Sequence, residues 1–175
     1  MKWVTRERPK IDRIACPWLI ARFIDKAPEF LFVPSKDVPQ VAEETRAIAY
    51  DVPGVELTHV GERCSFDAFL NKYQLTDPGL AMLAVIVRGA DTSRLDLAPE
   101  AAGLFAISLG LSQNFKNDHE MLKHGMSCTT HCTLGANTAR RSRMAGRPRF
   151  KKPDVRGRHP ARTHALLLRY EIVEE

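Results

Sequence analysis

The chain has 175 residues, of which 44% are hydrophobic and 27% charged, and this composition predicts one folded domain with a buried core. No run approaches the roughly 20 apolar residues needed to cross a bilayer, the N-terminal segment lacks an apolar signal region, and the four cysteines follow no disulfide spacing. We therefore expect a cytoplasmic protein that makes no membrane contact.

The first third of the chain has the pattern of a small sheet. Three short apolar runs are typical of buried strands: residues 3–5, 30–33 and 47–50. Between the first two runs, apolar residues recur at helical spacing, and we expect regular helix to start near Cys16 so that Pro17 falls in its first turn. Residues 38–46 suit a second crossover helix, which predicts a β-α-β-type sheet of about three strands.

From Ser65 onward the apolar residues follow a helical period. Helix starts are indicated by Ser65, by Asp77 with Pro78, by Pro99 and by Asn117. The predicted fold class is α+β, with the small N-terminal sheet followed by a bundle of about four helices.

The helical period fails after Met126. Residues 127–175 contain nine Arg and two Lys against one Asp and three Glu, which gives a net charge of +7. Residues 1–126 contain the remaining 15 basic and 17 acidic residues, a net charge of −2, and the two parts add up to the +5 of the whole chain. The tail has too few large apolar residues to offset the entropy of ordering it. We expect a folded domain over residues 1–126 and a largely disordered basic tail over residues 127–175.

Two arginines near the first helix are candidates for binding an anion. Arg13 lies at the helix start beside Asp12, and Arg22 falls close to the apolar stripe, ahead of Asp25. An arginine on a buried face is rare unless it pairs with a carboxylate or an anion. The alternative is a structural Arg–Asp pair that serves folding only.

The loop after the third strand combines several kinds of metal ligand. Asp51, His59 and Cys64 fall within a short stretch, and carboxylate, imidazole and thiolate all suit first-row metals. No standard spacing is matched, so a polar surface loop is the alternative. Arg88 and Asp91 end a later helix, where Arg88 either binds an anion or complements the helix dipole.

Further polar groups stand near the last predicted helix. Asp118 and His119 lie at its start, where a histidine is either a ligand or an ordinary surface residue. Cys128 and Cys132, with histidines at positions 159 and 164, resemble a two-Cys, two-His zinc pattern. The spacer between the pairs is far longer than a zinc finger uses, so we do not expect one.

Several strings in residues 3–126 resemble one bacterial family. They read WVTRERPKIDRIACPWLI at 3–20, DVPGVEL at 51–57, RCSFD at 63–67, RGAD at 88–91 and HGM at 124–126. They resemble the C-terminal domain of ChrB-type chromate-resistance proteins. The resemblance implies a cytoplasmic role in chromate resistance or chromate-responsive regulation. Full-length relatives sometimes carry a DNA-binding domain, whereas we expect no direct DNA binding by residues 1–126.

Our first hypothesis is a sensing or regulatory domain that binds chromate, a similar oxyanion, or a metal. A guanidinium fits a tetrahedral oxyanion with two-point geometry, which assigns the oxyanion to Arg13, Arg22 and Arg88. One first-row transition-metal ion is assigned to His59, Cys64, Asp118 and His119. Supporting roles are given to Asp12, Asp25 and Asp91. The alternatives are a metal-dependent redox or detoxification enzyme, and an interaction domain; the sequence leaves open whether any reaction is catalysed.

The resemblance ends at Met126, and the sequence that follows differs from the family sequence in a regular way. The family continues with a helix resembling VLYDALYAWC, where this chain has SCTTHCTLGA at residues 127–136. Adding one base after the Met126 codon converts the second string into the first, given the allowed third bases. We hypothesise that residues 127–175 are translated out of frame, through a mutation or a sequencing error. Loss of the family's apolar helix predicts marginal stability and exposed apolar surface.

Overall fold

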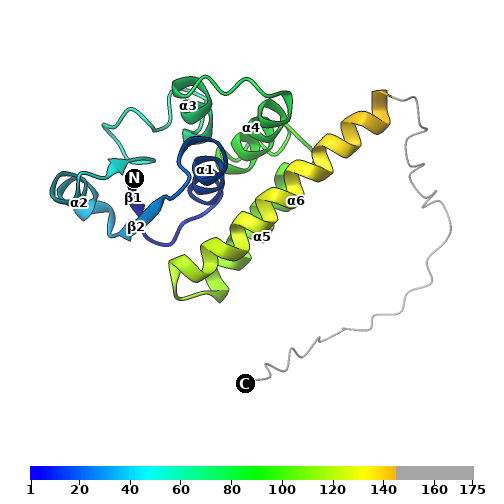
Figure 1. Ribbon diagram of the computed structural model, residues 1–175. Helices are drawn as coiled ribbons and strands as arrows, with labels where there is room; N and C mark the ends of the chain where they lie inside the picture. The colour runs from blue at the N-terminus through cyan, green and yellow to red at the C-terminus, as the bar shows by residue number, and fades with distance from the viewer. Residues whose placement is uncertain (145–175) are drawn as a thin grey trace, which may run out of the picture.

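The computed structural model describes residues 1–144, with side chains up to residue 138 (Figure 1). Its sheet is parallel, with strand order β2-β1-β3, and consists of β1 (Lys2–Arg6), β2 (Glu29–Val33) and β3 (Ile48–Ala49). Trp3 pairs with Phe30 on one side and with Ile48 on the other. The expected three-stranded β-α-β-type sheet is confirmed. Residues 145–175, for which we expected disorder, lie outside the described residues.

Two helices and two irregular turns form the crossovers: α1 (Asp12–Leu19), a π-helical turn (Ile20–Ile24), a 3-10 turn (Ser35–Asp37) and α2 (Val38–Thr45). The expected start of the first helix near Cys16 was wrong, because α1 begins at Asp12 with Pro17 in its interior. Tertiary contacts fix this first turn. Asp12 and Ile14 are buried, and the Ile11 N–H donates to the Ser108 hydroxyl at 2.7 Å. Packing therefore offsets the loss of the backbone hydrogen bond that Pro17 cannot donate.

The second half of the domain is helical, as expected. It contains α3 (Ser65–Lys72), α4 (Pro78–Asp91), α5 (Ala101–Asn114) and α6 (Asp118–Met144). The Asp77 carboxylate caps α4 by accepting hydrogen bonds from the N–H groups of Gly79 and Leu80 at 2.7 and 3.1 Å. Helices α5 and α6 lie side by side in Figure 1, with the sheet on the other side of α1. Among residues 1–144, no helix is both long and apolar enough to cross a membrane.

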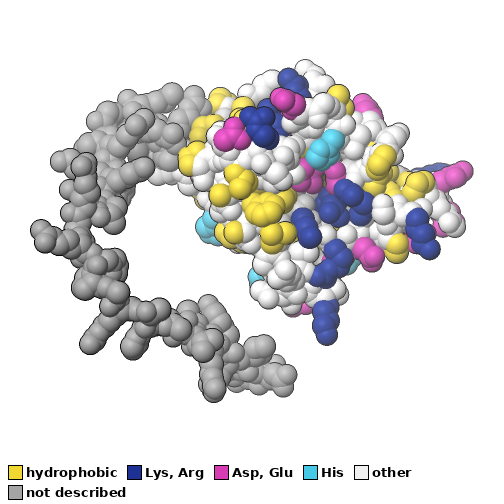
Figure 2. Space-filling model, turned by 180° about the vertical axis from the view of Figure 1, so that it is seen from behind, with side chains coloured by type: hydrophobic (Ala, Val, Ile, Leu, Met, Phe, Trp, Pro, Cys, Tyr) yellow, Lys and Arg dark blue, Asp and Glu magenta, His cyan; other side chains and the backbone are white. Residues whose placement is uncertain are grey.

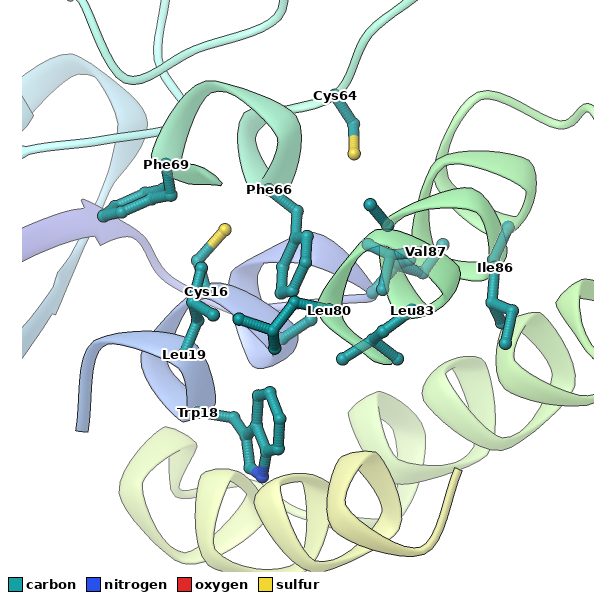
Figure 3. Packing of buried hydrophobic residues seen from close by; sticks show 14 of the residues in the cluster. Cys16, Trp18, Leu19, Cys64, Phe66, Phe69, Leu80, Leu83, Ile86 and Val87 are labelled. Carbon is teal, nitrogen blue, oxygen red and sulfur yellow. The ribbon is translucent and has the colours of Figure 1, made fainter. Parts of the chain in front are cut away.

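The main core lies between the sheet, α1, α3 and α4 (Figure 3). Trp3 is fully buried and its ring lies 5.8 Å from that of Phe69, while the neighbouring Val4 is buried in a second cluster under α2. Strand β1 is thus buried on both faces, as is usual for the central strand of a parallel sheet.

Helix α6 continues beyond Met126, where we expected the folded domain to end. In Figure 3 the Trp18 indole points from α1 toward α6, and its N–H donates to the Thr130 hydroxyl at 2.9 Å. Threonine hydroxyls in this part of α6 donate to backbone carbonyls one turn earlier: Thr129 to Gly125 at 3.0 Å, Thr130 to Met126 at 3.0 Å and Thr133 to Thr129 at 2.8 Å. These hydrogen bonds allow polar residues to lie within the helix. A prediction based only on the spacing of apolar residues therefore misses this part of α6.

Candidate metal centre

Four polar side chains meet near the C-terminal ends of strands β1 and β3. Asp12 is the first residue of α1, Asp51 follows β3, His59 stands in the loop before α3, and Asp91 is the last residue of α4. The ends of parallel strands and the helix termini next to them converge there, which is where α/β folds usually place their sites. Figure 2 shows acidic, basic and histidine side chains gathered together on one face of the molecule.

The His59 imidazole is at the centre of this group. Its Nε2 atom lies 3.0 Å from Asp91 Oδ2, 3.3 Å from Asp12 Oδ2 and 3.4 Å from Asp51 Oδ1. One ligand atom from each of Asp12, His59 and Asp91 lies within 4.8 Å of the other two. The three ligand atoms are thus close enough together for one ion to contact all of them after small side-chain movements.

Asp51 differs from Asp12 and Asp91 because two arginines pair with it. Its Oδ2 atom lies 2.6 Å from an Arg6 terminal nitrogen and 3.1 Å from Arg13 Nε, and its Oδ1 atom accepts a hydrogen bond from Ser65 at 2.8 Å. These partners satisfy Asp51 as a structural anion. Asp12 and Asp91 remain directed at His59.

The pKa values show how negative this site is. The hydrogen bond to Asp12 raises the pKa of His59 to about 9, helped by the Asp12, Asp91 and Asp51 charges and opposed by burial. Burial, followed by the Asp12 charge, raises the pKa of Asp91 to about 7. Burial and Asp12 also raise the pKa of Asp51, against the hydrogen bonds from Arg6 and Ser65. The site holds extra protons because its negative charge is incompletely compensated.

The backbone at the site is held in uncommon conformations. Ile11, just before Asp12, has φ of 46°, and Asp51 has φ of 54°. A β-branched residue rarely adopts positive φ, at a cost of about 1–3 kcal/mol. The Ile11 N–H is held by Ser108, and the Asp51 N–H donates to the Leu57 carbonyl at 2.8 Å. The surrounding structure therefore fixes the direction in which Asp12 and Asp51 leave the chain.

The three arginines proposed for an oxyanion are not brought together. Arg13 joins the cluster through Asp51. The Arg22 guanidinium lies 5.4 Å from the centre of the Trp18 ring and donates to Thr130 at 3.1 Å. Arg88 makes two hydrogen bonds to Asp67, at 3.1 and 3.0 Å. Each arginine thus has its own partner within the protein.

The four residues proposed for the metal are also separated, and only His59 lies in the cluster. Cys64 is buried next to Asp67, and burial holds the pKa of its thiol well above the usual value, so the thiol stays neutral. The Asp118 carboxylate accepts a hydrogen bond from the Arg8 backbone N–H at 2.9 Å. The His119 ring packs edge-on against Phe32, 5.3 Å away.

The three residues predicted to have supporting roles lie in two different places. Asp12 and Asp91 are the carboxylates that face His59. Asp25 lies elsewhere, where it accepts hydrogen bonds from the N-terminal ammonium at 2.7 Å and the Trp3 indole at 3.1 Å. Arg6 is a partner of Asp51 that was not predicted from the sequence. Its position at the end of the strand next to β3 is the signal that points to this pairing.

The donor set suits a first-row divalent metal ion. Carboxylates with one imidazole are ligands that Mn²⁺, Fe²⁺ and Zn²⁺ accept, and buried carboxylates need a cation to offset their charge. The His59 side chain is 40% exposed, while Asp12 is 2% exposed. The site is therefore anchored in the interior and open to solvent on one side.

Two sequence comparisons agree on one relationship. Residues 3–131 match the profile of the family described as "ChrB, C-terminal domain". Protein ChrB of Cupriavidus metallidurans (strain CH34) is 37% identical over 122 residues, which cover 69% of this chain and 36% of the relative. This chain thus spans little more than a third of the length of that curated relative. No solved structure shows significant similarity to this chain.

Proposed function

Because the chain belongs to the ChrB C-terminal domain family, we propose that it is a chromate-responsive domain that binds one first-row divalent metal ion. Asp12, His59 and Asp91 would hold the ion. The observation that carries this proposal is the convergence of their three ligand atoms within 4.8 Å, with Asp12 in the protein interior. Family membership supports the role in chromate resistance, and the cluster supports the metal.

The charge balance favours a cation over an oxyanion at this site. Three carboxylates surround His59, and the two arginines in contact with the cluster are both paired with Asp51. An oxyanion next to Asp12 and Asp91 would meet repulsion from like charges. Direct chromate binding by Arg13, Arg22 and Arg88 would require each to leave a protein partner. Chromate binding that is unchanged in Arg13→Ala and Arg22→Ala variants with normal melting temperatures would remove that hypothesis.

The metal proposal is tested by titrating the purified metal-free chain with Mn²⁺, an ion that prefers oxygen and imidazole ligands over thiolates. We expect one bound ion per chain, detected by electron paramagnetic resonance and elemental analysis. Asp12→Asn and Asp91→Asn should abolish binding. Asp96→Asn, which changes an exposed carboxylate paired with Arg94, is the matched control. Substoichiometric Mn²⁺ in the parent chain, or unchanged binding in both cluster variants, would contradict the proposal.

A second candidate function is a metal-dependent redox or detoxification enzyme. The exposed side of His59 favours it, because a catalytic metal keeps one position open for substrate. Cys64 does not support a thiolate role, since its pKa is raised by burial. Electrons would therefore come from an external low-molecular-weight thiol. Loss of chromate absorbance that depends on the thiol, the metal and Asp12 would favour the enzyme, whereas binding without turnover favours the sensor.

A further inference from the structure

A divalent ion in the carboxylate cluster would reverse the sign of its charge. Asp12, Asp51 and Asp91 carry three negative charges when ionised, and the two arginines that pair with Asp51 carry two positive charges. Metal ligands bind in their deprotonated form, so His59 is neutral in the loaded site. The cluster then has a net charge of −1 without the ion, which repels anions, and of +1 with it, which attracts them.

Three protein ligands leave the ion with open coordination positions. Mn²⁺ prefers octahedral surroundings with about six ligand atoms, and Zn²⁺ prefers four. Asp12 and Asp91 have side chains that are 2% and 13% exposed, whereas the His59 side chain is 40% exposed. A small ligand from solvent therefore reaches the ion from the side of His59.

Arg6 stands next to this opening. One carboxylate lies between it and His59, because Asp51 Oδ1 is 3.4 Å from His59 Nε2 and Asp51 Oδ2 is 2.6 Å from an Arg6 terminal nitrogen. The Arg6 side chain is 38% exposed, and its Nε atom has no hydrogen-bond partner among residues 1–138. A guanidinium has five N–H donors, so the bond to Asp51 leaves others for a ligand.

The surface around the opening favours the approach of an anion. Figure 2 shows Lys and Arg side chains next to the acidic and histidine side chains on this face. Lys10, two residues before Asp12, is exposed. Clustered positive charge raises the local concentration of anions and speeds their association.

From these observations we infer that the metal-loaded cluster binds one small tetrahedral oxyanion, with one oxygen on the ion and another on the Arg6 guanidinium. A guanidinium fits such anions because its planar fork donates to two oxygens. The anion replaces solvent on the ion, and no electron is transferred. This inference rests on the proposed metal site, and it gives the metal a role: the ion allows a site rich in carboxylates to accept an anion.

The test is equilibrium dialysis of the full chain against molybdate, a tetrahedral dianion, with manganese and molybdenum measured by elemental analysis. We expect one molybdate per chain in the presence of Mn²⁺, and binding weaker by about tenfold or more in its absence. Binding of two ligands is reciprocal, so saturating molybdate should tighten Mn²⁺ binding by the same factor.

Variants of Arg6 test its contact with the anion. Arg6→Ala should weaken molybdate binding about tenfold, the loss expected for one hydrogen bond to a charged group, while one Mn²⁺ still binds. Arg6→Lys keeps the charge without the fork and should fall between the two. Arg94→Ala removes a surface arginine paired with Asp96 and is the matched control. Melting temperatures show whether each variant is folded.

The outcomes separate this inference from the proposal on which it rests. Mn²⁺ that binds without promoting molybdate binding would overturn the anion site and leave the metal site standing. Molybdate that binds equally well without Mn²⁺, or equally well to a folded Arg6→Ala chain, would also overturn it. A parent chain that binds no Mn²⁺ would contradict the metal site itself, and the anion site with it.

Discussion

Asp91 Oδ2 lies 3.0 Å from His59 Nε2, and this contact joins the last residue of α4 to the loop that follows the sheet. Asp12 reaches the same nitrogen from the start of α1. The imidazole thus connects three parts of the chain that are far apart in sequence, so its protonation state affects how firmly they are held together.

Removing one carboxylate should make His59 a weaker base. Asp12→Asn takes away the hydrogen bond that contributes most to the raised pKa, so the pKa of His59 should fall from about 9 toward 6.5. The measurement is an NMR pH titration of the imidazole ring protons. Asp96→Asn is the control, because its carboxylate pairs with Arg94. A His59 pKa that stays near 9 in Asp12→Asn would show that the other two carboxylates suffice.

The metal-free protein should lose stability as pH rises. His59 has a folded pKa of about 9 against 6.5 unfolded, and Asp91 has about 7 against 3.8. Both values are raised, so the folded state binds more protons and their contribution to stability is lost as pH rises from about 4 to 9. Denaturant melts across this range should show a falling midpoint. The measurement should be repeated in Asp91→Asn, where the loss between pH 4 and 7 should shrink.

Bound Mn²⁺ should reverse this trend. The ion competes with protons for His59 and Asp91, so its affinity should increase with pH up to about 9. Saturating Mn²⁺ should therefore raise the melting temperature more at pH 8 than at pH 6. A larger shift at the lower pH would argue against coordination by these two residues.

Two arginine–aspartate pairs of similar geometry should differ in importance. Arg88 bonds twice to Asp67, whose carboxylate is 10% exposed and also accepts from the Cys64 N–H, whereas Arg94 bonds twice to Asp96 on the surface. Arg88→Ala leaves the largely buried Asp67 carboxylate without its cation and should lower the free energy of unfolding by about 2 kcal/mol. Arg94→Ala should change the denaturant midpoint little. Equal effects of the two substitutions would mean that burial of the aspartate does not determine how much each ion pair contributes to stability.

Two helix glycines should respond oppositely to alanine. A Cβ at Gly125 of α6 would lie 2.5 Å from Ile14 Cγ2, whereas at Gly110 of α5 it would meet nothing within 4 Å. Gly125→Ala should lower the free energy of unfolding by about 1–3 kcal/mol through overpacking against α1. Gly110→Ala should raise it by about 0.5–1 kcal/mol, because alanine favours the helix. Thermal melts of the two variants test the close approach of α6 to α1.

The reading-frame hypothesis for residues 127–175 leads to a separate prediction. Restoring the frame after Met126 replaces a polar stretch of α6 by an apolar one next to a groove already lined by Leu104 and Ile107. The restored chain should therefore unfold at higher denaturant concentration than the present one. Identical midpoints would contradict the predicted loss of stability, and intact-mass measurement of protein from its native source decides the frame itself.

Sequence periodicity predicted the strands and helices well because those signals are short-range. The apolar runs and the Asp77–Pro78 start of α4 are encoded within a few residues. The start of α1 and the continuation of α6 were not predictable in this way. The first depends on a hydrogen bond from Ile11 to Ser108, far along the chain, and the second on hydroxyl-to-carbonyl bonds such as that of Thr130.

The candidate site was predictable only in part. Asp12, His59 and Asp91 were all singled out, but in different roles, because spacing along the chain does not show which loops meet at the edge of a sheet. Cys64 attracted attention by its chemistry, yet burial keeps its thiol neutral. Residue type thus indicated the kind of ligand, and the tertiary packing of α1, α4 and the loop before α3 determined which ligands converge.

The chain has two tryptophans, and they lie in different parts of the core. Trp3 is fully enclosed beside Phe69, whereas the Trp18 indole ends on the Thr130 hydroxyl of α6. If α6 separates from α1, only the second indole gains water. The protein therefore contains its own optical reporter: in a Trp3→Phe background, a red shift of the remaining emission would reveal detachment of α6 before the sheet unfolds.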